Sequence, residues 1–510
     1  MRSNISTLSS IKKLAGQTVW YGVSSIAARF INYLLTPLLT YNLAHKEDYG
    51  KIGLIYSAIP ILNIIFTYGF ETAYFRFAAK DEYKKDLYST ASLSLFFSTL
   101  IFTLLLWIFQ HAFGQVVGLS DFPAIIQISI FIISLDALST VPFAKLRQEG
   151  RPRKFAFIQI AGILITIIVT WFYIAYCPNH VQPGDNNFLV LVYDPNTNPV
   201  VYVVLANLIK SIVVLLLLGS EIKQIRFSFN TRLWKEMMIY SLPLVIAGMG
   251  GMINETFDRL MLRWWLPGSV EHKETEVGIY NACYKLSILI TLFIQAFRLG
   301  AEPFFFKQAE SGNPQKTYAR VMKFFVITVC FTFLIINLFI PVWKHFISPG
   351  YWEGLAVVPI LVLANMCLGI YYNLSIWYKL SNRTRAGASI TLIGAGITFL
   401  INFLFIPRFS YMASAWATFT CYASMMVISF VWGQKAYYVP YPWKKLLAYM
   451  VIVIMLFFIH KGFIIVWNND IFSLALGSVF TFLFIFLVLK IEKKEFISMP
   501  VVGRYIERFL

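Results

Sequence analysis

The chain has 510 residues, of which 58% are hydrophobic, 17% aromatic and only 13% charged. Soluble domains average about 45–50% apolar and about 25% charged residues, so this composition excludes a water-soluble globular protein. The net charge of +18 comes mainly from cations in short segments between hydrophobic runs, and it therefore does not indicate a nucleic-acid partner.

Hydrophobic runs follow one another along the whole chain, and each is long enough to cross a bilayer. A hydrocarbon core of about 30 Å takes about 20 helical residues. The runs predict an all-α integral membrane protein with about fourteen transmembrane helices. In chain order, the predicted helices have cores at 16–40, 51–70, 88–112, 122–144, 155–176, 200–219, 238–265, 277–300, 321–342, 354–378, 387–406, 411–432, 446–466 and 471–489.

Lysine and arginine are distributed unequally between the two sides that these helices define. If the N-terminus is cytoplasmic, the inner segments contain 32 of the 43 cations, the outer segments contain 6, and 5 lie within or at the ends of spans. Because cytoplasmic loops are enriched in cations, we expect both termini to be cytoplasmic.

Cysteines and histidines give no sign of a metal site or a disulfide framework. Four of the five cysteines lie within predicted spans and Cys177 lies alone near the outer face, which predicts that they pack in the core. The six histidines fall at predicted outer ends or loops, where either a pH-sensitive face or tolerated polar residues would explain them. We expect no metal and no cofactor.

An internal repeat of about 231 residues relates two parts of the chain. Six helices per repeat is an even number, so the repeats are expected to be parallel, around an axis along the membrane normal. The predicted lobes are 1–220 and 221–440, each with six helices, and 441–510 adds two helices and a cytoplasmic tail. The equivalent positions, at offsets of 230 to 234, are Arg29 with Arg259, Glu71 with Glu302, Arg76 with Lys307, and the loop Lys145 to Arg151 with the loop Lys379 to Arg385.

Charges within spans predict the transport pathway, because a central charge costs about 2.5–3.5 kcal/mol on insertion scales. We expect Arg29, Arg259 and Lys285 to bind an anionic substrate in a cleft between the lobes. Glu71 with Arg76, and Glu302 with Lys307, are predicted to form an inner gate of ion pairs between the lobes. The full set predicted for gating or coupling is Glu71, Arg76, Glu255, Asp258, Arg298, Glu302 and Lys307.

Each of these charges also has a purely structural interpretation. Asp258 and Arg259 lie about 100° apart around a helix, so we do not expect them simply to pair, whereas Glu255 precedes Arg259 by four residues and could neutralise it. Arg263 is expected to extend its cation to the membrane surface. Asp136 and Lys210 are interpreted as local packing or interface residues.

Two segments resemble a known family. The stretch from Pro243 through Asp258-Arg259 and 277–280 to Lys285-Leu286, the segment 68–77, and the 6+6+2 arrangement are similar to the polysaccharide-transporter branch of the multidrug/oligosaccharidyl-lipid/polysaccharide exporter superfamily. The resemblance implies two lobes in a V shape and alternating access. It also implies export of undecaprenyl-pyrophosphate-linked repeat units across a bacterial inner membrane, for O-antigen, lipopolysaccharide or capsule.

The resemblance also implies partners and a driving force. The expected partners are a lipid-linked oligosaccharide, membrane lipid, a polysaccharide polymerase and other assembly proteins. Family members often place cations in the cavity, a role transferred here to Arg29, Arg259 and Lys285 only. Coupling to a proton or sodium gradient is expected at Asp258 or Glu255.

Two other functions remain open. A multidrug-type, cation-coupled exporter of the same superfamily would need an acidic cleft, and the excess of cations in the spans argues against it. A membrane glycan polymerase or acyltransferase would need a catalytic constellation, and the sequence places no histidine in the middle of a span. We therefore expect the chain not to be an enzyme and assign no catalytic residue.

Overall fold

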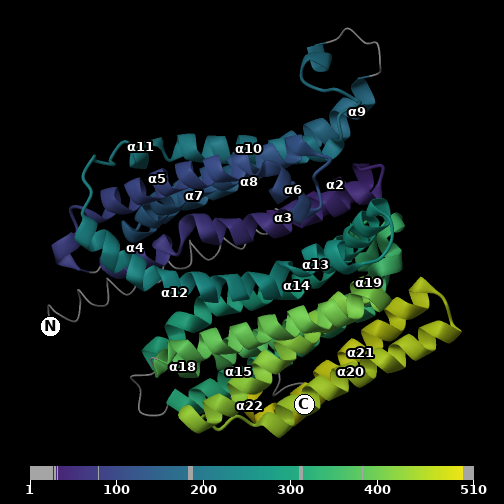
Figure 1. Ribbon diagram of the computed structural model, residues 1–510. Coiled ribbons are helices and arrows are strands. Elements are labelled where there is room, and N and C mark those ends of the chain that lie inside the picture. The colour runs from purple at the N-terminus through teal and green to yellow at the C-terminus, as the bar shows by residue number, and fades with distance from the viewer. Residues whose placement is uncertain are drawn as a thin grey trace. The chain divides into compact units, whose positions relative to one another are not determined.

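The computed structural model describes residues 27, 30–31, 33–78, 80–181, 188–308, 314–381 and 383–497 (Figure 1). Every regular element in these residues is a helix, and twelve helices are long and apolar enough to cross a membrane. The predicted all-α membrane fold is therefore confirmed.

The predicted number of fourteen spans is not confirmed. The run 16–40 lies mostly outside the described residues, which include only α2 (Leu35–Asn42) near its end. The runs 387–406 and 411–432 fall within a single element, α19 (Thr384–Ala436). A straight helix of its 53 residues would be about 80 Å long, far more than a bilayer. The backbone is non-helical at Ser410 (φ 47°, ψ −139°), between the two predicted runs.

Residue contacts divide the chain into two compact units. Unit 1 consists of Met1–Ala282 and Thr391–Cys421, and unit 2 consists of Cys283–Ile390 and Tyr422–Leu510. The long helices α14 (Val270–Gln308) and α19 contribute to both units. The lobe boundaries at 220 and 440 stay a prediction.

Unit 1 is built around α7 (Pro123–Gln148), which packs against α3, α4, α5, α8 and α10. In Figure 1 these helices run beside one another in purple and blue. Membrane helices of this kind approach closely where small residues face one another. The elements of unit 1 outside α2, α7, α14 and α19 are α3 (Lys46–Thr67), α4 (Phe70–Ala78), η1 (Asp81–Tyr83), α5 (Leu87–Ile108), α6 (Gln110–Val117), α8 (Pro152–Trp171), η2 (Phe172–Tyr176), α9 (Cys177–His180), η3 (Phe188–Leu191), α10 (Pro199–Leu217), α11 (Gly219–Ile222), α12 (Thr231–Thr256) and α13 (Asp258–Trp265).

A buried carboxylate, that of Glu221, connects two helices of unit 1 through ion pairs. Glu221 is fully buried and forms ion pairs with Arg151 at 2.8 Å and Lys154 at 2.7 Å. Burial alone would raise the pKa of Glu221, but the hydrogen bonds from Lys154 and Ser220 and the two cations outweigh it, so the pKa lies below its usual value. The ionised carboxylate therefore links α11 to the start of α8.

Unit 2 is built around α15 (Pro314–Leu338), which packs against α17, α20 and α21. The buried Lys323 donates to Glu492 and to Glu495, both at 2.9 Å, and Tyr449 donates to Glu492 at 2.7 Å. These bonds fix the C-terminal helix pair α20–α21, yellow in Figure 1, to α15. The elements of unit 2 outside α14, α15 and α19 are α16 (Ile340–Trp343), η4 (Lys344–Phe346), η5 (Pro349–Ala356), α17 (Val357–Leu374), α18 (Ile376–Leu380), α20 (Trp443–Val466), α21 (Asp470–Ile491) and α22 (Lys493–Ile497).

The cysteines and one histidine belong to the packed interior. All five cysteines are free thiols and buried, which confirms the predicted packing role. His460 lies inside α20, buried, with Nε2 3.0 Å from the carbonyl oxygen of Ser473. Its place between α20 and α21 is a packing position rather than an exposed outer end.

Candidate functional site

Unit 1 contains a polar cavity of about 640 Å³ enclosed by α4, α7, α8 and α10. Its wall includes two acids and two bases together with amides and hydroxyls, although all four helices are predominantly apolar. Polar groups at these positions are costly in lipid, so their convergence on one cavity indicates a hydrated space. The charged and polar lining residues are Glu71, Asp136, Ser139, Thr140, Arg147, Gln159, Thr166, Asn207 and Lys210.

The charges of this cavity are paired and partly exposed to it. Lys210 Nζ lies 3.7 Å from Asp136 Oδ1, and both side chains keep 28% of their surface accessible. Ser211 donates to the same Asp136 oxygen at 2.8 Å. Arg147 forms an ion pair with Glu71 and lies 4.7 Å from the centre of the Phe75 ring.

The interpretation of Asp136 and Lys210 as local packing or interface residues agrees with their contact, but it did not include the cavity that both residues line. The two residues come from α7 and α10 and share a cavity as well as a contact. The signal that could have revealed it is the presence of an acid and a base within two apolar runs. Such charges are retained in spans when they line a polar space or meet a partner.

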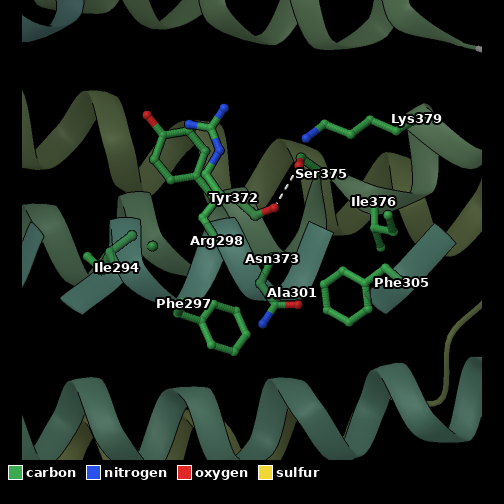
Figure 2. Close-up of a pocket in the computed structure, with 11 residues that line it drawn as sticks. Ile294, Phe297, Arg298, Ala301, Phe305, Tyr372, Asn373, Ser375, Ile376 and Lys379 are labelled. Carbon is green, nitrogen blue, oxygen red and sulfur yellow. Dashed lines mark hydrogen bonds between the residues drawn. The ribbon is translucent and has the colours of Figure 1, made fainter. Parts of the chain in front are cut away.

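Unit 2 contains a smaller pocket between α14, α17 and α18 (Figure 2). Arg298 and Lys379 both line it, and the Arg298 guanidinium lies 4.7 Å from the centre of the Tyr372 ring. In Figure 2 the two cationic groups lie in the upper part of the pocket, and the Asn373 amide lies below them near Phe297 and Phe305. The pocket is small, with a volume of about 20 Å³, and two cations in its lining favour an anionic group at its edge.

Local geometry explains how this pocket arises. The helix breaks between α17 and α18 at Ser375, whose hydroxyl donates to the Tyr372 carbonyl at 2.6 Å. A Cβ at Gly369 would lie 2.9 Å from Phe325 and 3.0 Å from Ile294, so the glycine allows α17 to approach α14 and α15 closely. The break and the close approach bring residues of α14, α17 and α18 around one space.

Asn373 is the unusual member of this pocket. It is only 3% exposed, and neither its amide nitrogen nor its amide oxygen has a hydrogen-bond partner among the described residues. A buried polar group without a partner costs about 1–3 kcal/mol, and native proteins rarely keep one without a function or a bound water. Asn373 therefore offers a donor and an acceptor in the pocket that the two cations also line.

The repeat-related lysines have different surroundings. Lys145 Nζ in unit 1 lies 4.0 Å from the centre of the Tyr88 ring and donates to Gln224. Lys379, its counterpart at an offset of 234, lines the pocket of unit 2. The sequence repeat therefore does not produce the same pocket twice.

Asp258 and Arg259 form a buried pair in unit 1, so the expectation that they do not pair is wrong. Arg259 Nη1 donates to Asp258 Oδ1 at 2.6 Å, and Tyr280 donates to the other carboxylate oxygen at 2.6 Å. Asp258 is the first residue of α13, and its Oδ1 also accepts the Arg259 backbone N–H at 3.0 Å, which places the carboxylate beside the neighbouring residue. Arg259 Nη1 also donates to Glu255 at 3.0 Å, and the acceptor is the backbone carbonyl oxygen of Glu255.

The other predicted substrate residues are not brought together by any contact described here. Arg29 lies outside the described residues, and Lys285 is a half-buried residue of α14 in unit 2. Arg259 belongs to unit 1. A shared cleft for these three cations stays a prediction.

The predicted gate is likewise untested. Glu71 pairs with Arg147 inside unit 1, and the Arg76 guanidinium lies 4.1 Å from the centre of the Tyr240 ring. Glu302 and Lys307 belong to α14, and their side chains are outside the described part of the structure. Arg263, expected to reach the surface, donates to the Gly118 carbonyl at 3.3 Å.

Comparison with known proteins supplies a family and a fold. Residues 14–307 match the sequence model of the family described as polysaccharide biosynthesis protein. A search of curated proteins found no match.

Solved structures with the same fold cover nearly the whole chain. A structure of the lipid II flippase MurJ in an inward closed conformation aligns over 92% of this chain and 99% of its own, with a TM-score of 0.65 and 13% identity. An inward-facing multidrug resistance MATE family transporter of the MOP superfamily aligns over 81% and 94%, with a TM-score of 0.61 and 12% identity. An outward-facing structure of such a transporter aligns over 83% and 95%, with a TM-score of 0.55 and 13% identity. These similarities show the fold of a multi-pass membrane transporter.

Proposed function

Since this chain belongs to the polysaccharide biosynthesis protein family, we propose that it is a flippase for undecaprenyl-pyrophosphate-linked oligosaccharide repeat units. It works in the inner membrane of a bacterium, with both termini in the cytoplasm. The translocated repeat units are delivered to a polymerase and other assembly proteins that build O-antigen or capsule. A protein with the same fold, MurJ, is a flippase for lipid II.

Transport of this cargo requires polar surroundings within the membrane, and charged pockets between apolar helices provide them. A diphosphate and its sugars cannot cross about 30 Å of hydrocarbon unaided, whereas a polyprenyl tail can stay in lipid. The protein must therefore replace the water around the headgroup during the crossing and leave the tail outside.

The observation that supports this proposal most strongly is the pocket shared by Arg298, Lys379 and Tyr372 in unit 2. Guanidinium and ammonium groups are the usual protein partners of phosphate, and one of each lines this single pocket. Both residues also lie in segments predicted to face the cytoplasm, the side on which the cargo is made. The polar cavity of unit 1 is large enough to accept hydroxyl-rich sugars.

Alternating access would move this headgroup from the inner to the outer leaflet. Coupling to a proton or sodium gradient at Asp258 or Glu255 is part of the proposal. Asp258 Oδ1 accepts from Arg259 Nη1 at 2.6 Å, so loss of this ion pair would release a cation within the predicted span 238–265. Such a release changes the balance between two conformations without any cofactor.

The test is a transport assay in liposomes with purified full-length protein. A fluorescently labelled undecaprenyl-diphosphate oligosaccharide is placed in both leaflets, and its movement is followed by protection from a membrane-impermeant quencher. The variant Arg298→Gln/Lys379→Gln is expected to flip at least about tenfold more slowly, because two charge-assisted contacts are lost. The matched control, Lys435→Gln/Lys444→Gln, removes the same charge from exposed residues outside the pocket and should flip normally.

Three results would contradict the proposal. Normal flipping by the Arg298/Lys379 variant would remove its principal support. Export of a cationic dye without movement of the glycolipid would favour the multidrug-type exporter. A lengthened or modified glycan after incubation would favour a polymerase or acyltransferase.

A further inference from the structure

Unit 1 has a second cavity, distinct from the polar one, which is lined mainly by apolar side chains. This groove has a volume of about 490 Å³ and lies between α3, α5 and α12. Its lining is almost wholly apolar and includes Ile65, Phe97, Ile101, Phe102, Leu242 and Val245. Ile101 and Leu242 are 57% and 51% exposed, so the groove is open on its outer side.

The few polar atoms in the groove already have partners. Tyr68 Oη lies 2.7 Å from Ser94 Oγ, Ser98 donates to Tyr68 at 3.2 Å, and the Trp234 indole donates to Ser94 at 2.9 Å. The groove therefore offers few hydrogen-bonding groups to a sugar or to water. A hydrocarbon chain is the occupant that its surface matches.

Cations gather at one end of this groove. Phe229 and Trp234 line that end, and Arg226 and Lys235 stand beside them in sequence. Lys235 also precedes Ile239, Leu242 and Ile246 at helical spacings of four, seven and eleven residues, a stripe of exposed apolar side chains. Lys235 therefore lies at the N-terminal end of this exposed apolar stripe of α12.

Lys223 precedes Arg226 by three residues in the sequence. Lys223, Arg226 and Lys235 are all exposed, and none of them forms an ion pair within the described residues. The neighbouring carboxylates have partners of their own. Glu236 accepts a hydrogen bond from Tyr83 and pairs with Lys80 and Arg232. Asp86 accepts from Ser228 at 3.2 Å and from Asn230 at 3.4 Å. The positive charge at this end is thus left for a ligand.

An apolar groove that ends in uncompensated cations is complementary to a lipid with an anionic headgroup. Basic clusters between membrane helices on the cytoplasmic side are recognised settings for anionic lipid headgroups. We propose that the α3–α5–α12 groove binds an anionic phospholipid. One acyl chain lies along Phe97, Ile101 and Leu242, and the phosphate is held by Lys223, Arg226 and Lys235. The groove shares no lining residue with either pocket assigned to the cargo, so the proposed phospholipid site does not depend on which glycan is transported.

The experiment measures lipid binding to the purified full-length protein by native mass spectrometry. The probes are phosphatidylglycerol and phosphatidylcholine with identical acyl chains. Wild-type protein is expected to retain phosphatidylglycerol in preference to phosphatidylcholine. The variant Lys223→Gln/Arg226→Gln/Lys235→Gln should bind phosphatidylglycerol at least about tenfold more weakly, because each cation near the surface contributes to anionic-lipid binding.

Two further variants separate the headgroup from the chain. Ile101→Trp fills the groove from its exposed side and should displace the bound phospholipid without removing any charge. The control Arg153→Gln/Lys435→Gln/Lys444→Gln removes three exposed cations that neither line the groove nor neighbour its lining residues in sequence, and it should bind phosphatidylglycerol like the wild type.

The proposal is overturned by any of four results. These are equal retention of the two lipids by the wild type, loss of binding in the control variant, unchanged binding in Ile101→Trp, and displacement of phosphatidylglycerol by undecaprenyl phosphate. The last result would assign the groove to the cargo tail. The flipping assay with labelled cargo is read separately, so failure of this inference does not imply failure of the proposed function.

Discussion

Arg259 donates from Nη1 to Asp258 Oδ1 at 2.6 Å, and both side chains are buried within unit 1. The same carboxylate accepts the Tyr280 hydroxyl at 2.6 Å, and the Arg259 guanidinium lies 5.2 Å from the centre of the Tyr280 ring. Adjacent residues of opposite charge thus form one neutral, hydrogen-bonded group that joins α13 to α14.

We expect Asp258→Asn to destabilise the protein strongly. Removing one partner of a buried ion pair leaves the other charge uncompensated, at a cost of about 3–5 kcal/mol. The measurement is the midpoint of thermal unfolding in detergent, followed by loss of the monodisperse peak in size-exclusion chromatography. In the double variant Asp258→Asn/Arg259→Met, which buries no charge, much of the loss should be recovered. An Asp258→Asn protein as stable as the wild type would contradict the role assigned to this pair.

Gly50 and Gly278 set the distance between α3 and α14 in unit 1. A Cβ at Gly50 would lie 1.9 Å from the Glu274 carbonyl oxygen, and a Cβ at Gly278 would lie 2.3 Å from the Lys46 carbonyl oxygen. Backbone atoms cannot move aside as a flexible side chain can. Either Gly→Ala substitution should therefore cost at least about 1–3 kcal/mol.

The control for this pair is Gly251→Ala in α12, where an added Cβ meets nothing within 4 Å. This substitution should leave the unfolding midpoint unchanged or raise it slightly, since alanine favours helix more than glycine does. The result that would refute the close approach is equal stability of Gly50→Ala and Gly251→Ala.

Stability should fall at acidic pH partly through Glu221. The pKa of this carboxyl is lower in the folded protein than its ordinary value of 4.5 in the unfolded chain. The ionised form therefore stabilises the fold above that value, and the contribution is lost as the pH falls from about 5 through the folded pKa. We expect Glu221→Gln to have a lower unfolding midpoint at pH 7 and a weaker dependence on pH between 5 and 3.5. Parallel curves for variant and wild type would show that Glu221 does not contribute.

Asn373→Leu should stabilise the protein while it slows transport. The substitution replaces a buried amide that has no partner among the described residues by an apolar group of similar size. It should raise stability by about 1–3 kcal/mol, because an unsatisfied polar group is removed. If the amide contacts the cargo, flipping should slow at the same time.

Asn365→Leu is the matched control for this prediction. Asn365 is also buried in α17 and has an unpartnered amide nitrogen, but it does not line the pocket. It should change stability without changing the flipping rate. A normal flipping rate in Asn373→Leu would restrict Asn373 to a structural role.

The sequence alone was sufficient to predict the membrane class and the positions of most spans. The predicted runs 88–112 and 471–489 correspond to α5 (Leu87–Ile108) and α21 (Asp470–Ile491). The prediction succeeds because a segment in hydrocarbon must satisfy its backbone hydrogen bonds within itself. An apolar run of about 20 residues therefore forms a helix. Family membership also followed from local motifs, since residues 14–307 match the family.

The partners of the charged side chains depended on the tertiary structure. Asp136 and Lys210 are 74 positions apart in sequence, yet they meet at 3.7 Å in the cavity of unit 1. Lys145 and Lys379 are equivalent in the repeat, yet one lies over Tyr88 and the other lines a pocket. Hydropathy fixes which segments are helices, whereas the surroundings of a side chain depend on how helices rotate, kink and approach one another. Those features arise from packing between distant segments, so they could not be read along the chain.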